Sequence, residues 1–488
     1  MKNASRVWSL LAVCATALAL GGCHHSNPVV GQTVVTPQGS IPWAWVGGTN
    51  LVGRSGVYNS ATPGLLTPGG RDGAASWMDT QGNLWVMGGV GYDVSGAVGN
   101  LNDLWEYTGG SWKFVSGSTT INAPGVYNLL NTPVGVGAAT PATTPGARSA
   151  AATWLDSTGN LWLFGGIGVD ANGLQGDLND LWEFSPSTGL WTWVSGSMTA
   201  NAKGVYAAAT GVPASQLVPG ARDGSVAWLD ATGNFWLFGG GGYDSVGNNG
   251  LLNDLWKYNP TTGLWTFVTA TLSSTGTVLA NAYPTYGTAG TAAATNFPGS
   301  RQAASGWIDK TGNLWLFGGN GFDSNTSNGY LNDVWKYVPS TNQWTWVSGS
   351  NIVNVGGNYS TQASFSANNA PGGRAGSAAT ADSTGNFWLF GGQGYDGAGT
   401  QGYLNDLWEF SPSTGQWQYL SGSALVNGLG NYPTLGAAGA TTNSPGARYS
   451  TVLHIDASNN LWVFGGAGYD SNAVLGDLND LWKVAVTP

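Results

Sequence analysis

Apolar and polar positions along the chain follow a long repeat, in which short alternating segments are separated by turn residues. Each repeat contains an apolar pair followed by two glycines, as in Leu163-Phe164-Gly165-Gly166, and the six copies lie 73 to 79 residues apart. In the second copy the alternation predicts four strands, at residues 148–156, 161–165, 178–184 and 191–195, here called strands a, b, c and d. Short strands joined by Gly, Pro, Asn and Asp at a fixed period are typical of an all-β propeller.

The two ends of the repeat region complement each other. The last copy stops after its strand c, near Val484, and lacks a strand d. Residues 43–47 read Trp-Ala-Trp-Val-Gly and match the strand-d segments at 191–195 and 344–348. We therefore predict a six-bladed β-propeller over residues 41–488 with four antiparallel strands per blade, closed by an N-terminal outer strand that completes blade six.

Strand direction determines which connections share an end of the propeller. Antiparallel strands reverse at every turn, so the a–b and c–d turns lie at one end and the b–c and d–a loops at the other. The first end carries only tight turns. The second carries b–c loops of about 12 residues and d–a loops of about 20 to 30 residues by the strand pattern. Loops on a rigid scaffold commonly carry binding residues, so we expect function at this long-loop end.

Each d–a loop contains a tyrosine a few residues after an asparagine or its equivalent. These tyrosines could pack each loop onto its blade, or they could form an aromatic ring that stacks on sugars or peptides. Both interpretations follow from the pattern. The candidate ligand-binding residues are Tyr58, Tyr127, Tyr206, Tyr286, Tyr359 and Tyr432.

Three features of the repeat resemble the kelch family. They are the glycine pairs, the tryptophan that follows each strand-b leucine or its equivalent, and the Leu-Asn-Asp-Leu-Trp segments such as residues 178–182. The resemblance covers about residues 41–488 and implies a β-propeller. The repeat here is near 75 residues, whereas a kelch repeat has about 50. The extra length falls mainly between strands d and a, which weakens the functional analogy.

The N-terminus predicts export and lipidation. Lys2 and Arg6 precede an apolar stretch at residues 7–20, and Leu20-Gly21-Gly22-Cys23 follows and resembles a bacterial lipobox. We predict a lipoprotein signal peptide at residues 1–22, lipidation of Cys23 and an anchored linker at residues 23–40. His24 after the cysteine favours the outer membrane, so we expect a cell-envelope lipoprotein that meets the membrane through its lipid anchor alone.

The amino-acid composition excludes some classes of partner and of stabilising bond. The formal net charge is −10 and charged residues make up only 8% of the chain. An acidic chain repels phosphate backbones, so we expect no nucleic-acid partner. Cys14 and Cys23 are the two cysteines of the sequence and both precede the repeats, so we expect packing alone to stabilise the domain.

Charged residues recur at fixed repeat positions. Six arginines begin strand a, one aspartate set follows strand b, a second opens strand c and a third ends strand a. A sixfold set of identical groups indicates architecture, and we predict one Arg–Asp ion pair per blade tying strand a to the b–c region. The predicted partners are Arg71, Arg148, Arg222, Arg301, Arg374 and Arg448 with Asp93, Asp170, Asp244, Asp323, Asp396 and Asp470. The strand-c set is Asp103, Asp180, Asp254, Asp333, Asp406 and Asp480.

Candidate chemistry is scarce. His454 is the one histidine of the repeats, and it stands where four other repeats have the strand-a tryptophan, so we interpret it as a core or channel-lining residue. One histidine without a cysteine makes no ordinary transition-metal site. We predict no catalytic residue, no metal and no cofactor, with calcium as the one cation that the excess aspartates at the long-loop end could bind. Asp72, Asp177, Asp223 and Asp477 belong to that excess.

The sequence favours a binding protein over an enzyme. The first hypothesis is a propeller that binds a glycan, peptide or protein partner at its long-loop end. The alternative is a sugar-acting enzyme of the mutarotase or epimerase type, which six-bladed kelch proteins include, with Arg and Asp near the channel and His454 as candidates. A purely structural envelope component is a third hypothesis. Departures from the repeat consensus are too few, by sequence alone, to locate one pocket.

Overall fold

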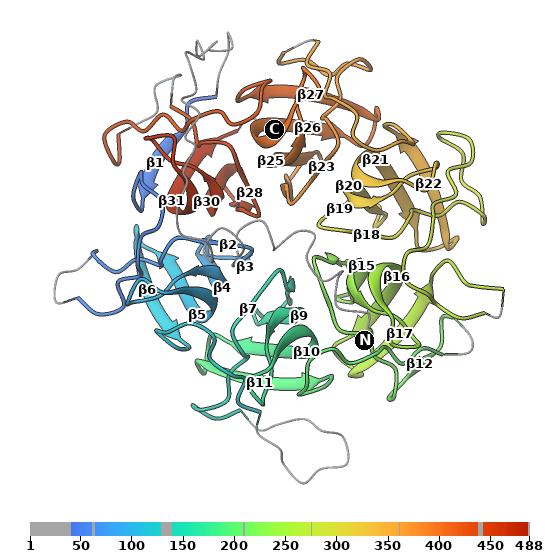
Figure 1. Cartoon of the computed structure of the whole chain (residues 1–488), viewed down its shortest axis with the longest axis horizontal. Helices are drawn as coiled ribbons and strands as arrows, with labels where there is room; N and C mark the ends of the chain where they lie inside the picture. The colour runs from blue at the N-terminus through green and yellow to red at the C-terminus, as the bar shows by residue number, and fades with distance from the viewer. Residues whose placement is uncertain are drawn as a thin grey trace, which may run out of the picture. The chain divides into compact units, whose positions relative to one another are not determined.

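The computed structural model describes residues 41–60, 64–127, 139–207, 210–274, 276–360, 362–437 and 443–486. The predicted signal peptide, the linker and Cys23 lie outside these residues. In the described residues the strands form six antiparallel sheets arranged as a ring (Figure 1), which confirms the six-bladed β-propeller. No helix in the described part of the chain is long and apolar enough to cross a membrane.

Each blade has the same order of strands, from the centre outwards. Strand a is split in two: β2 (Arg71–Asp72) and β3 (Ala75–Met78), β7 (Arg148–Ser149) and β8 (Ala152–Leu155), β13 (Arg222–Asp223) and β14 (Val226–Leu229), β18 (Arg301–Gln302) and β19 (Ser305–Ile308), β23 (Arg374–Ala375) and β24 (Ala378–Ala381), β28 (Arg448–Tyr449) and β29 (Val452–Ile455). Strand b is β4 (Leu84–Tyr92), β9 (Leu161–Val169), β15 (Phe235–Tyr243), β20 (Leu314–Phe322), β25 (Phe387–Tyr395) and β30 (Asn460–Tyr469).

Strands c and d complete the blades. Strand c is β5 (Val98–Thr108), β10 (Gln175–Ser185), β16 (Asn249–Asn259), β21 (Asn328–Val338), β26 (Gln401–Ser411) and β31 (Leu475–Ala485). Strand d is β6 (Ser111–Ser116), β11 (Leu190–Ser195), β17 (Leu264–Thr269), β22 (Gln343–Ser348), β27 (Gln416–Ser421) and, for blade six, β1 (Ala44–Gly47). A further short strand, β12 (Pro213–Ala214), pairs with β17 at the edge of blade three.

Strands b and c extend further than the sequence pattern predicted. In blade two, the ladder continues beyond the glycine pair to Val169 and begins again at Gln175, so the b–c connection is shorter than expected. Gly165 and Gly166 have φ angles of 64° and 92°. They form an irregularity within strand b rather than its end, because glycine adopts positive φ without strain and lets the ladder resume.

The chain closes on itself as predicted. β1 pairs antiparallel with β31, with Ala44 opposite Lys483 and Trp45 opposite Trp482. In Figure 1 the blue N-terminal strand lies beside the red C-terminal blade. Trp43, which precedes β1, is 2% exposed and packs against Phe390 of blade five. The N-terminal segment therefore covers the outer edge of blade six.

A continuous belt of backbone hydrogen bonds encircles the centre. Each blade contributes one belt residue, which lies between the two segments of its strand a. The backbone N–H of each belt residue donates to the carbonyl of the belt residue in the preceding blade at 2.7–2.9 Å. All six have φ between 51° and 63°. A step across one residue and one hydrogen bond spans about 6 Å, so opposite sides of the belt lie about 12 Å apart. The belt consists of Gly73, Ala150, Gly224, Ala303, Gly376 and Ser450.

Candidate functional site

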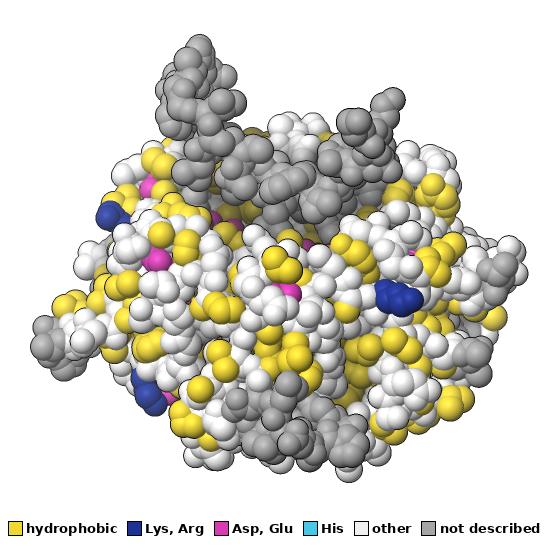
Figure 2. Space-filling model, turned by 60° about the horizontal axis from the view of Figure 1, so that its bottom comes forward, with side chains coloured by type: hydrophobic (Ala, Val, Ile, Leu, Met, Phe, Trp, Pro, Cys, Tyr) yellow, Lys and Arg dark blue, Asp and Glu magenta, His cyan; other side chains and the backbone are white. Residues whose placement is uncertain are grey.

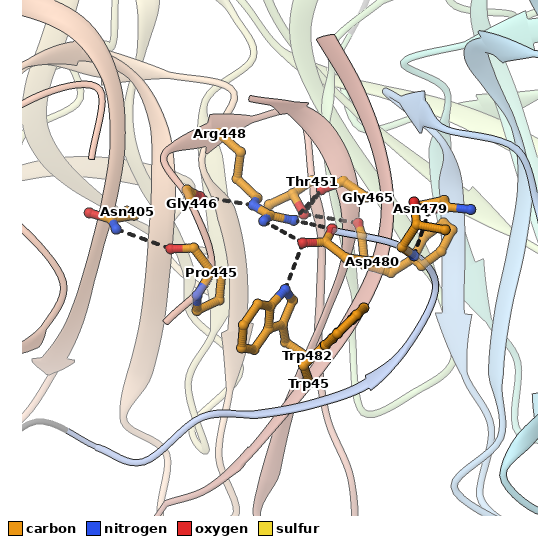
Figure 3. A network of polar contacts seen from close by, with 12 residues as sticks. Trp45, Asn405, Pro445, Gly446, Arg448, Thr451, Gly465, Asn479, Asp480 and Trp482 are labelled. Carbon is orange, nitrogen blue, oxygen red and sulfur yellow. Dashed lines mark hydrogen bonds and ion pairs between the residues drawn. The ribbon is translucent and has the colours of Figure 1, made fainter. Parts of the chain in front are cut away.

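The recurring arginines are anchored inside the blades. In blade six (Figure 3), Arg448 Nε donates to the Gly446 carbonyl at 2.9 Å and Nη1 donates to the Gly465 carbonyl at 2.9 Å. Nη1 and Nη2 also donate to the two carboxylate oxygens of Asp480 at 2.7 and 2.8 Å. Trp482 Nε1 donates to the same carboxylate at 2.7 Å. Such bidentate geometry fixes both side chains.

All six blades contain this buried pair, and its aspartate is the one that opens strand c. The pairs are Arg71–Asp103, Arg148–Asp180, Arg222–Asp254, Arg301–Asp333, Arg374–Asp406 and Arg448–Asp480. Their side chains are 0–1% exposed. The prediction of one ion pair per blade is confirmed, but the predicted partners after strand b were wrong.

The aspartates after strand b instead organise the b–c turns. Asp170 Oδ1 accepts the backbone N–H groups of Asn172 and Leu174 at 2.8 and 2.9 Å, and Oδ2 accepts that of Ala200 at 3.1 Å. Burial acts to raise the pKa of Asp170, but these N–H groups outweigh it and lower the pKa. The same turn contacts recur at Asp93, Asp244, Asp323, Asp396 and Asp470. The aspartate leaves the ladder at the end of strand b, so it meets turn amides rather than the arginine.

The loop tyrosines belong to the same buried network. The Tyr432 hydroxyl donates to Asp480 at 2.7 Å, and its ring lies 5.0 Å from that of Trp482. Tyr58, Tyr127, Tyr206, Tyr286 and Tyr359 make the equivalent bond to the strand-c aspartate of their own network, at 2.5–2.8 Å. Burial raises the pKa of each of the six hydroxyls. These contacts favour loop anchoring over the alternative, ligand stacking.

At the long-loop end, one three-residue row per blade changes in composition from blade to blade. Each row crosses strands a, b and c, and its strand-a member stands between the recurring arginine and the belt residue. Directly opposed residues in an antiparallel ladder share one face of the sheet. From blade one to blade six the rows are Asp72–Val90–Asn100, Ser149–Ile167–Asp177, Asp223–Gly241–Leu251, Gln302–Asn320–Tyr330, Ala375–Gln393–Tyr403 and Tyr449–Ala467–Asp477. We call these rows the rim.

At the rim, the strand-c residue of one blade meets the strand-a residue of the next. Asp72 of blade one and Asp477 of blade six lie on adjoining strands, β2 and β31, and each perturbs the pKa of the other. Asp177 of blade two acts electrostatically on Asp223 of blade three. Because the closed belt joins residues adjacent to Asp72 and Asp223, these junctions surround a common axis.

Both carboxyl pairs hold protons more strongly than ordinary aspartates. Burial, reinforced by repulsion from Asp177, raises the pKa of Asp223 to about 8, and burial raises the pKa of Asp177 to about 6. Burial raises the pKa of Asp477 to about 6, and burial together with Asp477 raises the pKa of Asp72 well above its usual range. Two close carboxyls in a partly desolvated place share a proton because both cannot ionise cheaply.

Between the two carboxyl pairs lies a neutral polar junction. Asn100 and Ser149 are 4% and 3% exposed, and neither Asn100 Oδ1 nor Ser149 Oγ has a hydrogen-bond partner among the described residues. Asn100 shares its row with Asp72, and Ser149 shares its row with Asp177. These three junctions lie on one side of the ring, with the apolar Val90 and Ile167 between them. We call their residues, Asp477, Asp72, Asn100, Ser149, Asp177 and Asp223, the polar arc.

The opposite side of the rim carries tyrosines among uncharged residues such as Gln302, Asn320 and Gln393. Tyr403 of blade five stacks on Tyr449 of blade six, with ring centroids 5.2 Å apart and planes 9° from parallel. Tyr469 at the end of β30 lies 6.1 Å from Tyr403, and Tyr330 lies 6.3 Å from Tyr395. We call Tyr330, Tyr395, Tyr403, Tyr449 and Tyr469 the aromatic arc. The junction of blades five and six is three blades away from that of blades two and three, so Tyr403 and Tyr449 face the Asp177–Asp223 pair across the ring.

Sequence reasoning missed this site although its signal was present. The sequence pattern identifies the four aspartates only as excess negative charge and predicts no acid pair. They occupy two repeat positions, two aspartates at each, where the other four blades carry neutral residues. Pairing them required knowing that strand c of one blade faces strand a of the next. The departures from the repeat therefore do locate one site.

His454 lies away from the rim. It occupies strand a of blade six, pairs with Trp462 in the ladder, and its Nε2 is 3.0 Å from Ser76 Oγ of blade one. Burial lowers the pKa of His454 to about 4. Its tryptophan counterparts likewise reach the next blade, since Trp77 Nε1 donates to the Trp154 carbonyl at 3.0 Å. These contacts support the interpretation of His454 as a packing residue.

Comparison with known proteins adds one structural similarity. No family model matches the chain, and no curated protein matches it. Among solved structures, that of YjhT is similar at 15% sequence identity and a TM-score of 0.49, and the match covers 88% of this chain and 98% of that one. At this identity the similarity concerns the fold alone.

Proposed function

We propose that this propeller binds a glycan at the rim, between the polar arc and the aromatic arc. The asymmetry of the rim is the observation that carries the proposal. Architectural positions repeat six times, whereas the rim changes from paired carboxyls to stacked tyrosines around one axis. Sugars present hydroxyl groups and apolar ring faces at once, and these need hydrogen-bonding groups on one side and an aromatic surface on the other.

The proposal extends the sequence-based hypothesis of a binding partner at the long-loop end. The kelch-type relationship, the lipid anchor at Cys23 and an outer-membrane location remain parts of the proposal. It requires no cofactor, because hydrogen bonds and stacking suffice for sugar recognition. A peptide or protein partner is the competing outcome.

Screening the purified chain on a glycan array, followed by calorimetric titration of the best hit, tests the proposal. We expect Tyr449→Ala to weaken binding at least tenfold, because it removes one ring of the stacked pair. Tyr449→Phe keeps the ring and serves as the matched control. Lys310→Ala changes an exposed residue at the tight-turn end and should leave binding unchanged. Retention of peptides or proteins with no glycan bound would overturn the proposal.

A sugar-acting enzyme is a second candidate function, favoured by the carboxyl pairs. A group whose pKa lies near neutrality can both donate and accept a proton at neutral pH, and Asp223 and Asp477 meet this condition. NMR measurement of anomeric exchange with the bound sugar tests it. Exchange faster than in buffer that Asp223→Asn abolishes would support an enzyme, and exchange equal to buffer would exclude this reaction.

A further inference from the structure

The polar arc offers many hydrogen-bond acceptors and few donors. Its four carboxyls retain at most a shared proton in each pair. Between them, Asn100 Oδ1 is a buried acceptor without a partner, and the unpartnered Ser149 Oγ can accept as well as donate. A buried polar atom without a hydrogen bond costs free energy, so a ligand that brings donors to this place is favoured.

Among the described residues, no cation forms an ion pair with the arc. The six arginines next to the rim are not accessible to a ligand. Each is at most 1% exposed and donates its hydrogen bonds to carbonyl groups and to the aspartate of its own blade. Among the described residues, Arg54 and Lys203 are exposed cations on loops of this end, and neither forms an ion pair with the arc. On the side shown in Figure 2, charged side chains are few and separate. The arc therefore opposes an anionic ligand.

We infer that the glycan bound at the rim is a basic amino sugar, whose ammonium group donates to the polar arc while its ring packs on the aromatic arc. This inference rests on the proposed function and specifies its ligand class. An ammonium group carries three donors and a positive charge, which matches an arc of carboxylates, Asn100 Oδ1 and Ser149 Oγ. An acidic sugar would place like charges together, and an N-acetylated one would lose the charge.

Three oligosaccharides of equal length separate the alternatives: the tetramer of glucosamine, the tetramer of N-acetylglucosamine and the tetramer of galacturonic acid. Calorimetric titration of the purified chain at pH 7 should give at least tenfold tighter binding for the glucosamine tetramer than for its acetylated form. No binding is expected for the acidic tetramer.

Variants distinguish recognition by the arc from attraction to an acidic protein. Asp177→Asn combined with Asp223→Asn should reduce the preference for the amino sugar at least fivefold. Glu106→Gln also removes a carboxylate, but at the tight-turn end beside Lys113, and should leave the preference unchanged. Tyr449→Ala should weaken all binding tetramers, because stacking does not depend on charge. Circular dichroism of each variant checks that the fold is retained.

The possible results distinguish failure of this inference from failure of the proposed function. Equal affinity for the amino and acetylated tetramers, or tighter binding of the acidic tetramer, would overturn the inference and leave glycan binding intact. Equal loss with Glu106→Gln and with the double variant would also overturn it. Failure of the array and of all three tetramers would overturn the proposed function and the inference together.

Discussion

At the residue scale, the same side chain type serves opposite purposes in this protein, according to its neighbours. Asp230 directly follows β14 and accepts hydrogen bonds from Thr232, Asn234 and Trp236, which overcome its burial and lower its pKa. Asp223 is seven positions earlier but faces another carboxyl, and its pKa is raised to about 8. Hydrogen-bond donors stabilise the ionised form of Asp230, whereas a neighbouring carboxyl destabilises the ionised form of Asp223.

This difference predicts opposite pH effects of two matched substitutions. In the unfolded chain Asp223 titrates near 3.8, so the folded state binds more protons between about pH 4 and 8 and its stability falls as pH rises through that range. Asp223→Asn should therefore raise the free energy of unfolding at pH 8 by on the order of 1 kcal/mol, after allowance for solvent screening, and have little effect at pH 4. Asp230→Asn should lower the free energy of unfolding at pH 7. Urea denaturation at several pH values measures both, and destabilisation by Asp223→Asn at pH 8 would contradict the pairing.

The buried ion pairs predict a second residue-scale effect. Arg222→Leu leaves Asp254 charged and buried, which should cost about 3–5 kcal/mol of unfolding free energy. Adding Asp254→Leu should recover much of that loss, because the uncompensated carboxylate is gone. Arg222→Lys keeps the charge but loses the bidentate geometry, so it should fall between the wild type and Arg222→Leu. Denaturant titration measures the series, and a cost of Arg222→Leu below 1 kcal/mol would contradict a structural role.

At the element scale, β1 differs from every other outer strand. The other five follow strand c through a short turn, whereas β1 reaches β31 from the opposite end of the domain. Pairing and the burial of Trp43 hold it in place. An unpaired β31 would present an exposed edge, which is a site for association with other chains.

Two tryptophan substitutions test this role of β1. Trp43→Ala and Trp191→Ala each remove a buried ring next to or within an outer strand, and each should cost about 3–5 kcal/mol. Trp43→Ala should also cause concentration-dependent association, because β1 can detach and expose β31. Trp191→Ala should stay monomeric, since a short turn keeps β11 beside β10. Size-exclusion chromatography with light scattering measures this, and identical behaviour of the two variants would contradict the closing role.

At the scale of the whole molecule, neighbouring blades share their cores. One hydrophobic cluster combines Trp154 and Phe164 of blade two with Phe235 and Trp265 of blade three, and others join further neighbours in the same way. The backbone belt and β1 close the ring, so no blade has a free side. Losing one blade would expose the apolar surfaces of two others.

We therefore expect the propeller to unfold in one cooperative transition. Calorimetric and van't Hoff enthalpies should agree, and tryptophan fluorescence and circular dichroism should give one midpoint. Trp43→Ala, which weakens closure, should broaden the transition. Two resolved transitions in the wild-type chain would show that the blades unfold independently and would contradict the shared-core argument.

The sequence by itself determined the number of blades, their strand order, the N-terminal closure and the end that carries the long loops. These follow from local features, because a strand's alternation, a glycine pair and a turn each depend on residues close together in the chain. The ion pairs could be predicted only in part. The repeat predicts one ion pair per blade, but it contains two sets of aspartates at the long-loop end, and either set could pair with the arginine. Only the register of strands b and c decided between them.

The tertiary structure alone decided where the candidate site lies. Asp72 and Asp477 meet because β2 and β31 are neighbours in the closed ring, although almost the whole chain separates them. Tyr403 and Tyr449 meet for the same reason across the junction of blades five and six. Contacts between blades depend on how sheets pack side by side, and that geometry leaves no trace in the spacing of a single repeat.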